Sequence, residues 1–187
     1  MEREIIMLKV TKINSLIKED IEIDRYIPIK VKWHESSKSS KEIICWRTGD
    51  LKKSMLEVGV LADSGEIYSL TIVSVDKITI SSEEHQENSE VESGTPVFDM
   101  INWVGKRTIN DVGLFVVQYC DERLVMTISR NHISKEIMSG RVSFGTDVNM
   151  NVCRISINNL SDDEKLQVID TLEYMTKTQA CNWAAST

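Results

Sequence analysis

The stretch SMLEVGVLADSGEIYSLTIVS, residues 54–74, decides the fold, because it is the longest run of the chain with one consistent pattern. Its first half alternates the apolar residues Leu56, Val58 and Val60 with other side chains. A polar break containing Gly65 follows, and the second half is rich in β-branched and aromatic residues. Alternation with a period of two, a glycine-containing break and a second β-rich run together predict a β-hairpin.

Similar strand signals recur on both sides of this hairpin. They lie at residues 27–33, 42–46, 77–80, 112–119, 123–129, 141–144 and 152–157. The last four runs are separated by short polar breaks and predict two further hairpins. Residues 1–20 favour a strand over a helical turn, while 95–104 fit a helix start or a strand equally well. A turn is predicted at 47–50 and a short helical turn at 132–139.

The clearest helix signal lies near the C-terminus. Ser161 and Glu164 have the spacing of a capping box, and acidic residues occupy the first turn between them. An apolar face at helical spacing follows, formed by Leu166, Val168, Ile169, Leu172 and Met175. The sequence therefore predicts an α+β fold, mainly antiparallel β-sheet built from successive hairpins, with the C-terminal helix packed on it.

Charge and length restrict the classes of function. The chain has 187 residues, with 22 Lys and Arg against 29 Asp and Glu, which gives a net charge of −7. Nucleic-acid binding is disfavoured, because it needs a basic face to neutralise phosphate. A basic protein partner is compatible with this charge. No signal peptide and no apolar run of about 18 residues occurs, so we expect a cytoplasmic protein without a membrane span.

Residues 81–94 form the sharpest shift in composition. This segment contains five glutamates, Glu83, Glu84, Glu87, Glu90 and Glu92, and no Lys or Arg. It predicts a solvated loop or linker between an N-terminal lobe at 1–80 and a C-terminal lobe at 95–187, unless the chain is one continuous domain. Such a flexible anionic segment could dock into the basic cleft of a nuclease, or it could be a plain connection. Asp121 and Glu122, at the tip of a predicted hairpin, would extend this acidic binding surface.

Catalytic and metal-binding motifs are missing from the sequence. The three histidines, His34, His85 and His132, have no nucleophile motif around them. The acidic cluster around His85 has metal-ligand atom types, but a flexible loop lacks the rigid geometry that metals require, so we interpret it as solvated charge. The glycines have no nucleotide-binding spacing, and the four cysteines form no CxxC pair. We therefore predict a protein without catalytic residues, metal or cofactor. The alternative is a small hydrolase or transferase that uses scattered residues around His34 or His132.

Three stretches resemble the immunity proteins of bacterial contact-dependent growth inhibition and related polymorphic toxin systems. They are the hairpin segment at 54–66, GRVSFGTDVNMNVCRISI at 140–157, and NLSDDEK at 159–165. The resemblance implies a protein that is not an enzyme and that binds a cognate toxin domain one to one, neutralising it. A nuclease toxin suits the acidic charge of the chain. No toxin-contacting residue follows from the resemblance, because such families diversify their binding faces.

Overall fold

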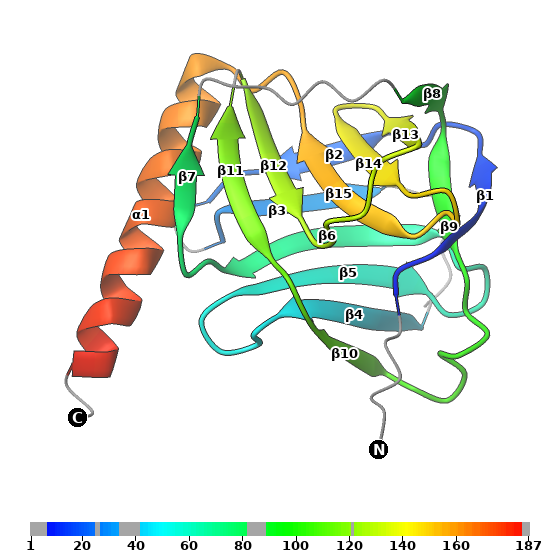
Figure 1. Cartoon of the computed structure of the whole chain (residues 1–187), viewed down its shortest axis with the longest axis horizontal. Helices are drawn as coiled ribbons and strands as arrows, with labels where there is room; N and C mark the ends of the chain where they lie inside the picture. Colours follow the sequence, from blue (N-terminus) through cyan, green and yellow to red (C-terminus); the bar gives the residue numbers. More distant parts are fainter. Residues whose placement is uncertain (1–6, 25–26, 34–41, 82–88, 121, 185–187) are drawn as a thin grey trace.

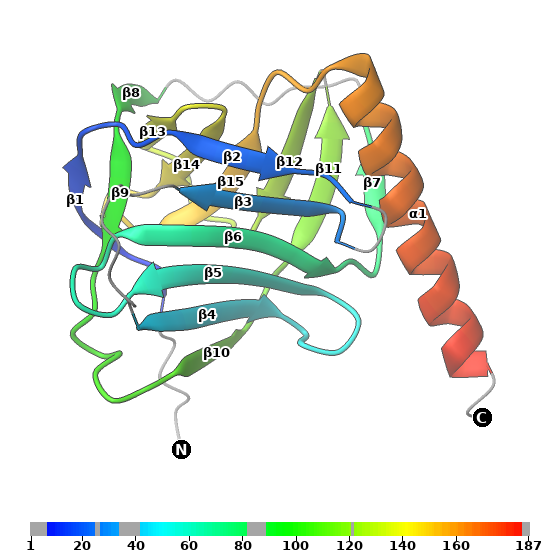
Figure 2. The ribbon, with the colours of Figure 1, turned by 180° about the vertical axis from the view of Figure 1, so that it is seen from behind.

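The computed structural model describes residues 7–24, 27–33, 42–81, 89–120 and 122–184, with side chains as far as residue 174 and at 176. Two β-sheets face each other across a shared core, and one long helix stands beside them (Figures 1 and 2). In Figure 1 the strands of the front sheet run mostly upright, whereas those of the rear sheet run across the view. The two sheets therefore cross rather than align.

The rear sheet has six strands. In chain order they are β2 (Glu19–Glu22), β3 (Ile29–Trp33), β4 (Ile43–Gly49), β5 (Met55–Leu61), β6 (Ile67–Ser74) and β10 (Thr108–Val112). Their order across the sheet is β10-β4-β5-β6-β3-β2. All neighbouring pairs are antiparallel except β10 and β4, which run parallel.

The front sheet has seven strands. They are β7 (Ile78–Ile80), β8 (Glu90–Ser93), β11 (Val116–Cys120), β12 (Arg123–Thr127), β13 (Lys135–Ser139), β14 (Val142–Thr146) and β15 (Val152–Ile157). Their order is β7-β11-β12-β15-β14-β13-β8, and both edge strands are parallel to their neighbours. A separate two-stranded sheet joins β1 (Val10–Asn14) to β9 (Thr95–Phe98), and α1 spans Asp162–Ala184.

The hairpin predicted at 54–74 is confirmed as β5 and β6, which pair antiparallel. Leu56, Val58 and Val60 are all fully buried, as their alternation predicted. Gly65 has a φ of 74°, and its carbonyl accepts a 2.7 Å hydrogen bond from the Phe98 N–H at the end of β9. A side chain at Gly65 would meet this approaching strand, so the turn requires glycine.

The core between the two sheets contains aromatic residues from distant parts of the chain. The ring of Trp33 on β3 lies 6.1 Å from that of Phe144 on β14, and Phe98 lies 6.4 Å from Phe144. The Trp33 Nε1–H donates a buried 2.9 Å hydrogen bond to Ser139 Oγ on β13. The two sheets are therefore joined by a polar contact as well as by apolar packing.

The predicted C-terminal helix is confirmed, and the fold is α+β. The capping box forms: the Ser161 N–H donates to Glu164 Oε2 at 2.9 Å, and the Glu164 N–H donates to Ser161 Oγ at 3.3 Å. Val168 and Leu172 are fully buried, as predicted, whereas Leu166 is 60% exposed. The buried stripe of α1 is thus narrower than the apolar pattern indicated.

Three local predictions are wrong. Residues 132–139 contain strand β13 rather than a helical turn, because Ile137 packs into the core as the inward residue of a strand. The acidic segment at 81–94 ends in strand β8, which pairs with β13 and is therefore not all loop. The turn predicted at 47–50 lies partly inside β4, which continues to Gly49.

Strand pairs cross the predicted boundary at 81–94. Three described pairs join residues before 81 to residues after 94: β1 with β9, β4 with β10, and β7 with β11. Such pairing is what the alternative of one continuous domain implies.

Candidate functional site

Two of the predicted binding residues lie together on edge strand β8. Glu90 and Glu92 are two positions apart and therefore share one face of this strand. Lys135 on β13 lies between them, with its Nζ 3.3 Å from Glu90 Oε1 and 3.0 Å from Glu92 Oε2. The Glu90 side chain is 70% exposed and that of Glu92 is 44% exposed, against 21% for Lys135. The edge therefore presents two carboxylates above one partly covered ammonium group.

The two carboxylates change the titration of the lysine. Lys135 donates a hydrogen bond to Glu92 and interacts in the same way with Glu90, and both contacts raise its pKa above the ordinary value. The ammonium group is therefore fully charged at neutral pH. It cancels one of the two negative charges, which leaves this edge with a net charge of −1.

The other predicted acidic residues are placed apart or lie outside the described residues. Glu122 is exposed at the β11–β12 tip with a φ of 60°, and its carbonyl accepts a 2.9 Å hydrogen bond from the Leu160 N–H. Four strand spacings, about 19 Å, separate β12 from β8, so Glu122 lies at a distance from Glu90 and Glu92 on the front sheet. Glu83, Glu84, Glu87 and Asp121 lie outside the described residues.

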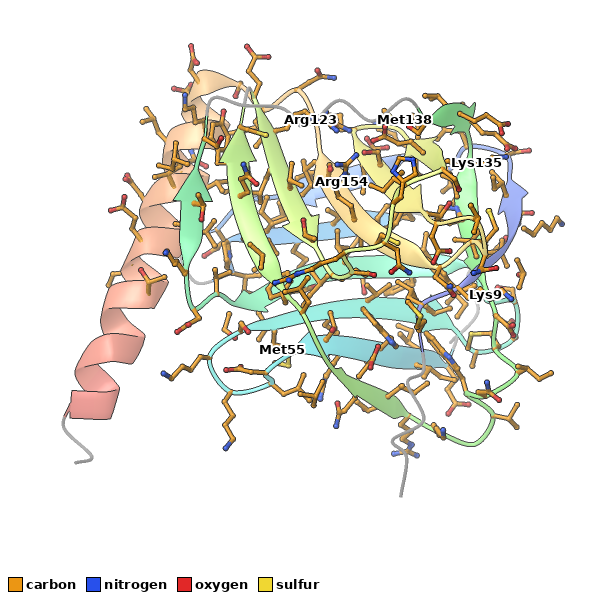
Figure 3. The ribbon with its side chains drawn as sticks, viewed as in Figure 1. Lys9, Met55, Arg123, Lys135, Met138 and Arg154 are labelled. Atoms are coloured by element: carbon orange, nitrogen blue, oxygen red, sulfur yellow. The ribbon has the colours of Figure 1, made fainter. Side chains whose placement is uncertain are left out.

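A charged group on the outer face of the front sheet was missed by the sequence reasoning. Arg123 on β12 places Nη2 at 3.6 Å from Glu136 Oε1 on β13, and the two side chains are 23% and 16% exposed. Arg154 on β15 lies on the same sheet between these strands (Figure 3). Ser143 on β14 and Ser156 on β15 are register partners in this sheet, and both are buried. Alternation in β12 could have placed Arg123 on this face. Glu136 could not be placed there, because residues 132–139 were incorrectly predicted to form a helical turn.

The two loops that follow β12 and β14 are held together by one buried carboxylate. Asp147 accepts hydrogen bonds from the Asn131 side chain at 2.8 Å and from the N–H groups of Asn149 and Asn151 at 2.9 and 3.0 Å. Burial alone would raise the pKa of Asp147, but these donors lower it below the ordinary value. Since N–H donors occupy the carboxylate, its role here is to fix the loops.

Three cavities lie among the described residues. The largest, about 530 Å³, lies between α1 and the end of β2, and the others have volumes of about 320 and 230 Å³. Their linings contain neither histidine nor cysteine. His132 is exposed and lines none of them, and His34 and His85 lie outside the described residues. Among the residues that the structure describes, no group of three or more His, Cys, Asp or Glu could hold a metal ion.

Three cysteines have described side chains, and the fold covers each of them at least in part. Cys120 and Cys153 are buried, and Cys45 is half-buried beside Glu57. Burial, followed by the nearby Glu57 carboxylate, raises the pKa of the Cys45 thiol. The thiol is therefore protonated at neutral pH, which makes it a weak nucleophile.

Within the described residues, no helix is long and apolar enough to cross a membrane. No protein-family model matches the chain, and no curated protein matches it.

Proposed function

We propose that this chain is an immunity protein, which binds a cognate toxin domain one to one and blocks its active site or the entry of its substrate. One observation carries the proposal. The stretch at 54–66 is far in sequence from the stretches at 140–157 and 159–165. It forms β5 and the turn that leads into β6, whereas the other two form β14, β15 and the start of α1. Buried residues of all three belong to the same core. The resemblance therefore covers the scaffold, which is the part that proteins with divergent binding faces would share.

The charge distribution supports a nuclease as the toxin. Nucleases need cationic clefts to hold phosphate, and an acidic inhibitor is attracted to such a cleft. The chain has a net charge of −7, and Glu90 and Glu92 present exposed carboxylates on β8. These glutamates are the described part of the acidic surface that we propose for toxin binding.

The function is tested by co-expression with the toxin domain encoded beside the gene for this chain. We expect growth to be restored when both proteins are made and a one-to-one complex to elute from size-exclusion chromatography with light scattering. Failure of the wild-type chain either to restore growth or to bind the toxin domain would contradict the proposed function.

The electrostatic part of the proposal is tested by paired charge changes. The double variant Glu90→Gln/Glu92→Gln should slow association with a catalytically inactive toxin domain by about three- to tenfold at low salt, because steering depends on local charge. Lys135→Gln should speed association, since it removes the positive charge that lies between the two carboxylates. Stopped-flow association rates at low and high ionic strength measure both effects.

A matched control removes the same amount of charge elsewhere. Asp63 and Asp76 are exposed and flank β6, away from β8. The double variant Asp63→Asn/Asp76→Asn should slow association less than the glutamate variant at low salt. At an ionic strength of about 0.1 M it should change the rate by less than about twofold, because screening then limits the reach of a surface charge to about 10 Å. Equal slowing by both double variants would show that only the total charge matters, and an unchanged rate in the glutamate variant would remove β8 from the binding surface.

A further inference from the structure

The backbone of strand β8 directs part of its hydrogen-bonding groups away from the sheet. The Glu90 N–H donates to the carbonyl of Ser134, directly before β13, at 3.1 Å, and the Gly94 N–H donates to the carbonyl of Met138 on β13 at 3.0 Å. In a parallel pair, alternate residues of a strand bond to the same neighbour. The N–H and C=O groups of Val91 and Ser93 therefore point to the opposite side. Among the described strands, none pairs with β8 on that side.

The side chains of β8 differ between its two faces. Val91 is apolar and 64% exposed on one face. Glu90 and Glu92 lie on the other face and hold Lys135 between them. An extended segment added at this edge would meet backbone donors and acceptors, an apolar side chain on one face and carboxylates on the other. Main-chain bonds of this kind supply affinity in strand addition, and alternate side chains supply specificity.

Charge distinguishes β8 from the other sheet edges. The rear sheet also ends in an open edge at β10, but exposed Lys106 and Arg107 directly precede that strand. The edge strand β7 lies beside α1 in both ribbon views (Figures 1 and 2). At β2, Glu19 is bonded to the Arg141 N–H of the other sheet at 2.7 Å. Strand β2 also carries exposed carboxylates, Asp20 and Glu22, but the register places them opposite Lys32 and Lys30 of β3. Strand β8 instead combines outward backbone groups with two exposed carboxylates that share a single lysine.

We propose that an extended basic segment of the cognate toxin adds to β8 as a further strand of the front sheet. Its main chain bonds to the outward groups of Val91 and Ser93, and Lys or Arg at alternate positions face Glu90 and Glu92. An apolar residue of the segment covers Val91. This inference rests on the proposed function and specifies the binding edge and the chemistry of the bound segment.

A proline scan of the two open edges tests the inference. Val91→Pro removes an outward N–H and leaves the bonds from β8 to β13 in place, because proline is tolerated where the N–H faces away from the sheet. We expect it to weaken binding of the catalytically inactive toxin domain by about tenfold or more. Val91→Ala keeps the N–H and should weaken binding less than Val91→Pro does, since it removes only part of the apolar contact. Asn110→Pro removes an outward N–H from β10 and should leave the affinity unchanged. Calorimetry on the full chain measures all three.

A second measurement uses the wild-type chain and so does not depend on how the variants fold. Amide exchange followed by NMR should show protection of the Val91 and Ser93 N–H groups when the toxin domain binds, with no added protection of Thr108, Asn110 and Val112. If the toxin domain binds the wild type but neither protects these two amides nor discriminates Val91→Pro from Val91→Ala, the inference fails and the proposed function stands. If the wild type does not bind the toxin domain, the proposed function and the inference both fail.

Discussion

A single carboxylate joins the two sheets at the turn between β13 and β14. Glu19 on β2 of the rear sheet accepts a 2.7 Å hydrogen bond from the Arg141 N–H, which belongs to the front sheet. Gly140 precedes Arg141 with a φ of 65°, and a Cβ at this position would collide with the Glu19 carboxylate. Gly140 is therefore required twice, by its backbone conformation and by the close approach of another strand.

The two requirements can be separated by comparison with Gly105. This residue has a similar φ of 75°, but a Cβ there would have no neighbour within 4 Å. Gly105→Ala should lower the free energy of unfolding by about 1 kcal/mol, which is the strain of the left-handed conformation alone. Gly140→Ala should cost about 2–3 kcal/mol, because it also displaces the Glu19 carboxylate from the Arg141 N–H. Urea unfolding of both variants measures the difference.

The origin of the extra cost is checked by a double variant. A Glu19→Ala background removes the three atoms that would lie nearest to a Cβ at Gly140, so Gly140→Ala should then cost about as much as Gly105→Ala. Equal costs for Gly140→Ala and Gly105→Ala in the wild-type background would contradict the role assigned to Glu19.

At the scale of elements, the first turn of α1 is attached to the front sheet by an ion pair. Arg141 donates hydrogen bonds to both carboxylate oxygens of Glu164, at 3.0 and 2.8 Å, and to the carbonyls of Asn158 and Asn159. Glu164 also accepts from the Ser161 N–H in the capping box. The same carboxylate thus caps the helix and fixes its direction relative to β14.

This attachment should depend on pH. The hydrogen bond from Arg141 lowers the pKa of Glu164 below its ordinary value, although partial burial acts in the opposite direction. A lowered pKa in the folded state means that the ionised carboxylate stabilises the fold above the unfolded pKa, about 4.3 for glutamate, and that this contribution is lost as the pH falls through the folded pKa. Glu164→Gln should therefore cost about 1 kcal/mol near neutral pH and much less near pH 3.

Urea unfolding of the wild type and of Glu164→Gln across this pH range gives the difference in their free energies of unfolding. Amide exchange in the first turn of α1 shows whether the loss of stability is located there. Asp162→Asn is the matched control, since Asp162 also lies in the acidic first turn but no contact with Arg141 is recorded for it. A cost of Glu164→Gln that stays constant with pH would show that the ion pair does not stabilise the helix.

The elements predicted correctly from the sequence are those with local signals. The hairpin of β5 and β6 follows from the alternation around Val58, and the start of α1 follows from Ser161 and Glu164. Strand β13 was missed because Ile137 is its one fully buried apolar residue, with charged neighbours on the preceding positions. Strand β8 was missed because Val91 is its one apolar residue. Both are strands because of their partners, which a local pattern does not contain.

The candidate site likewise depends on contacts between segments that are distant in the sequence. Glu90 and Glu92 were selected for their charge, and the structure places both on one edge. Their contact with Lys135, the outward backbone of Val91 and the pairing of Arg123 with Glu136 all depend on which strands lie side by side. The parallel pairs at three sheet edges join segments far apart in the chain. No residue pattern within one segment could have indicated them.

At the scale of the whole molecule, Phe144 connects the two sheets most directly. It is fully buried on β14, and its ring faces Trp33 from β3 and Phe98 from β9. These three residues come from opposite sides of the segment at 81–94, and strand pairs also cross it. Because contacts on both sides of that segment share one core, we expect the described fold to unfold as one cooperative unit.

Phe144→Ala tests this expectation. It removes the shared ring and leaves Trp33 and Trp103 in the sequence as fluorescent probes. We expect the free energy of unfolding to fall by about 3–5 kcal/mol, as for other buried aromatic truncations. The decrease in the free energy of unfolding should be the same whether it is followed at Trp33, which lies before residues 81–94, or at Trp103, which lies after them. Both tryptophans are buried. Fluorescence of variants that retain Trp33 or Trp103 as the single tryptophan, compared with circular dichroism during urea unfolding, measures each side separately. Phe144→Leu should shift the unfolding transitions of both probes together by a smaller amount, since most of the side-chain volume is kept. If Phe144→Ala shifts the Trp33 transition and leaves that of Trp103 in place, the two halves are independent units and the cooperative description is wrong.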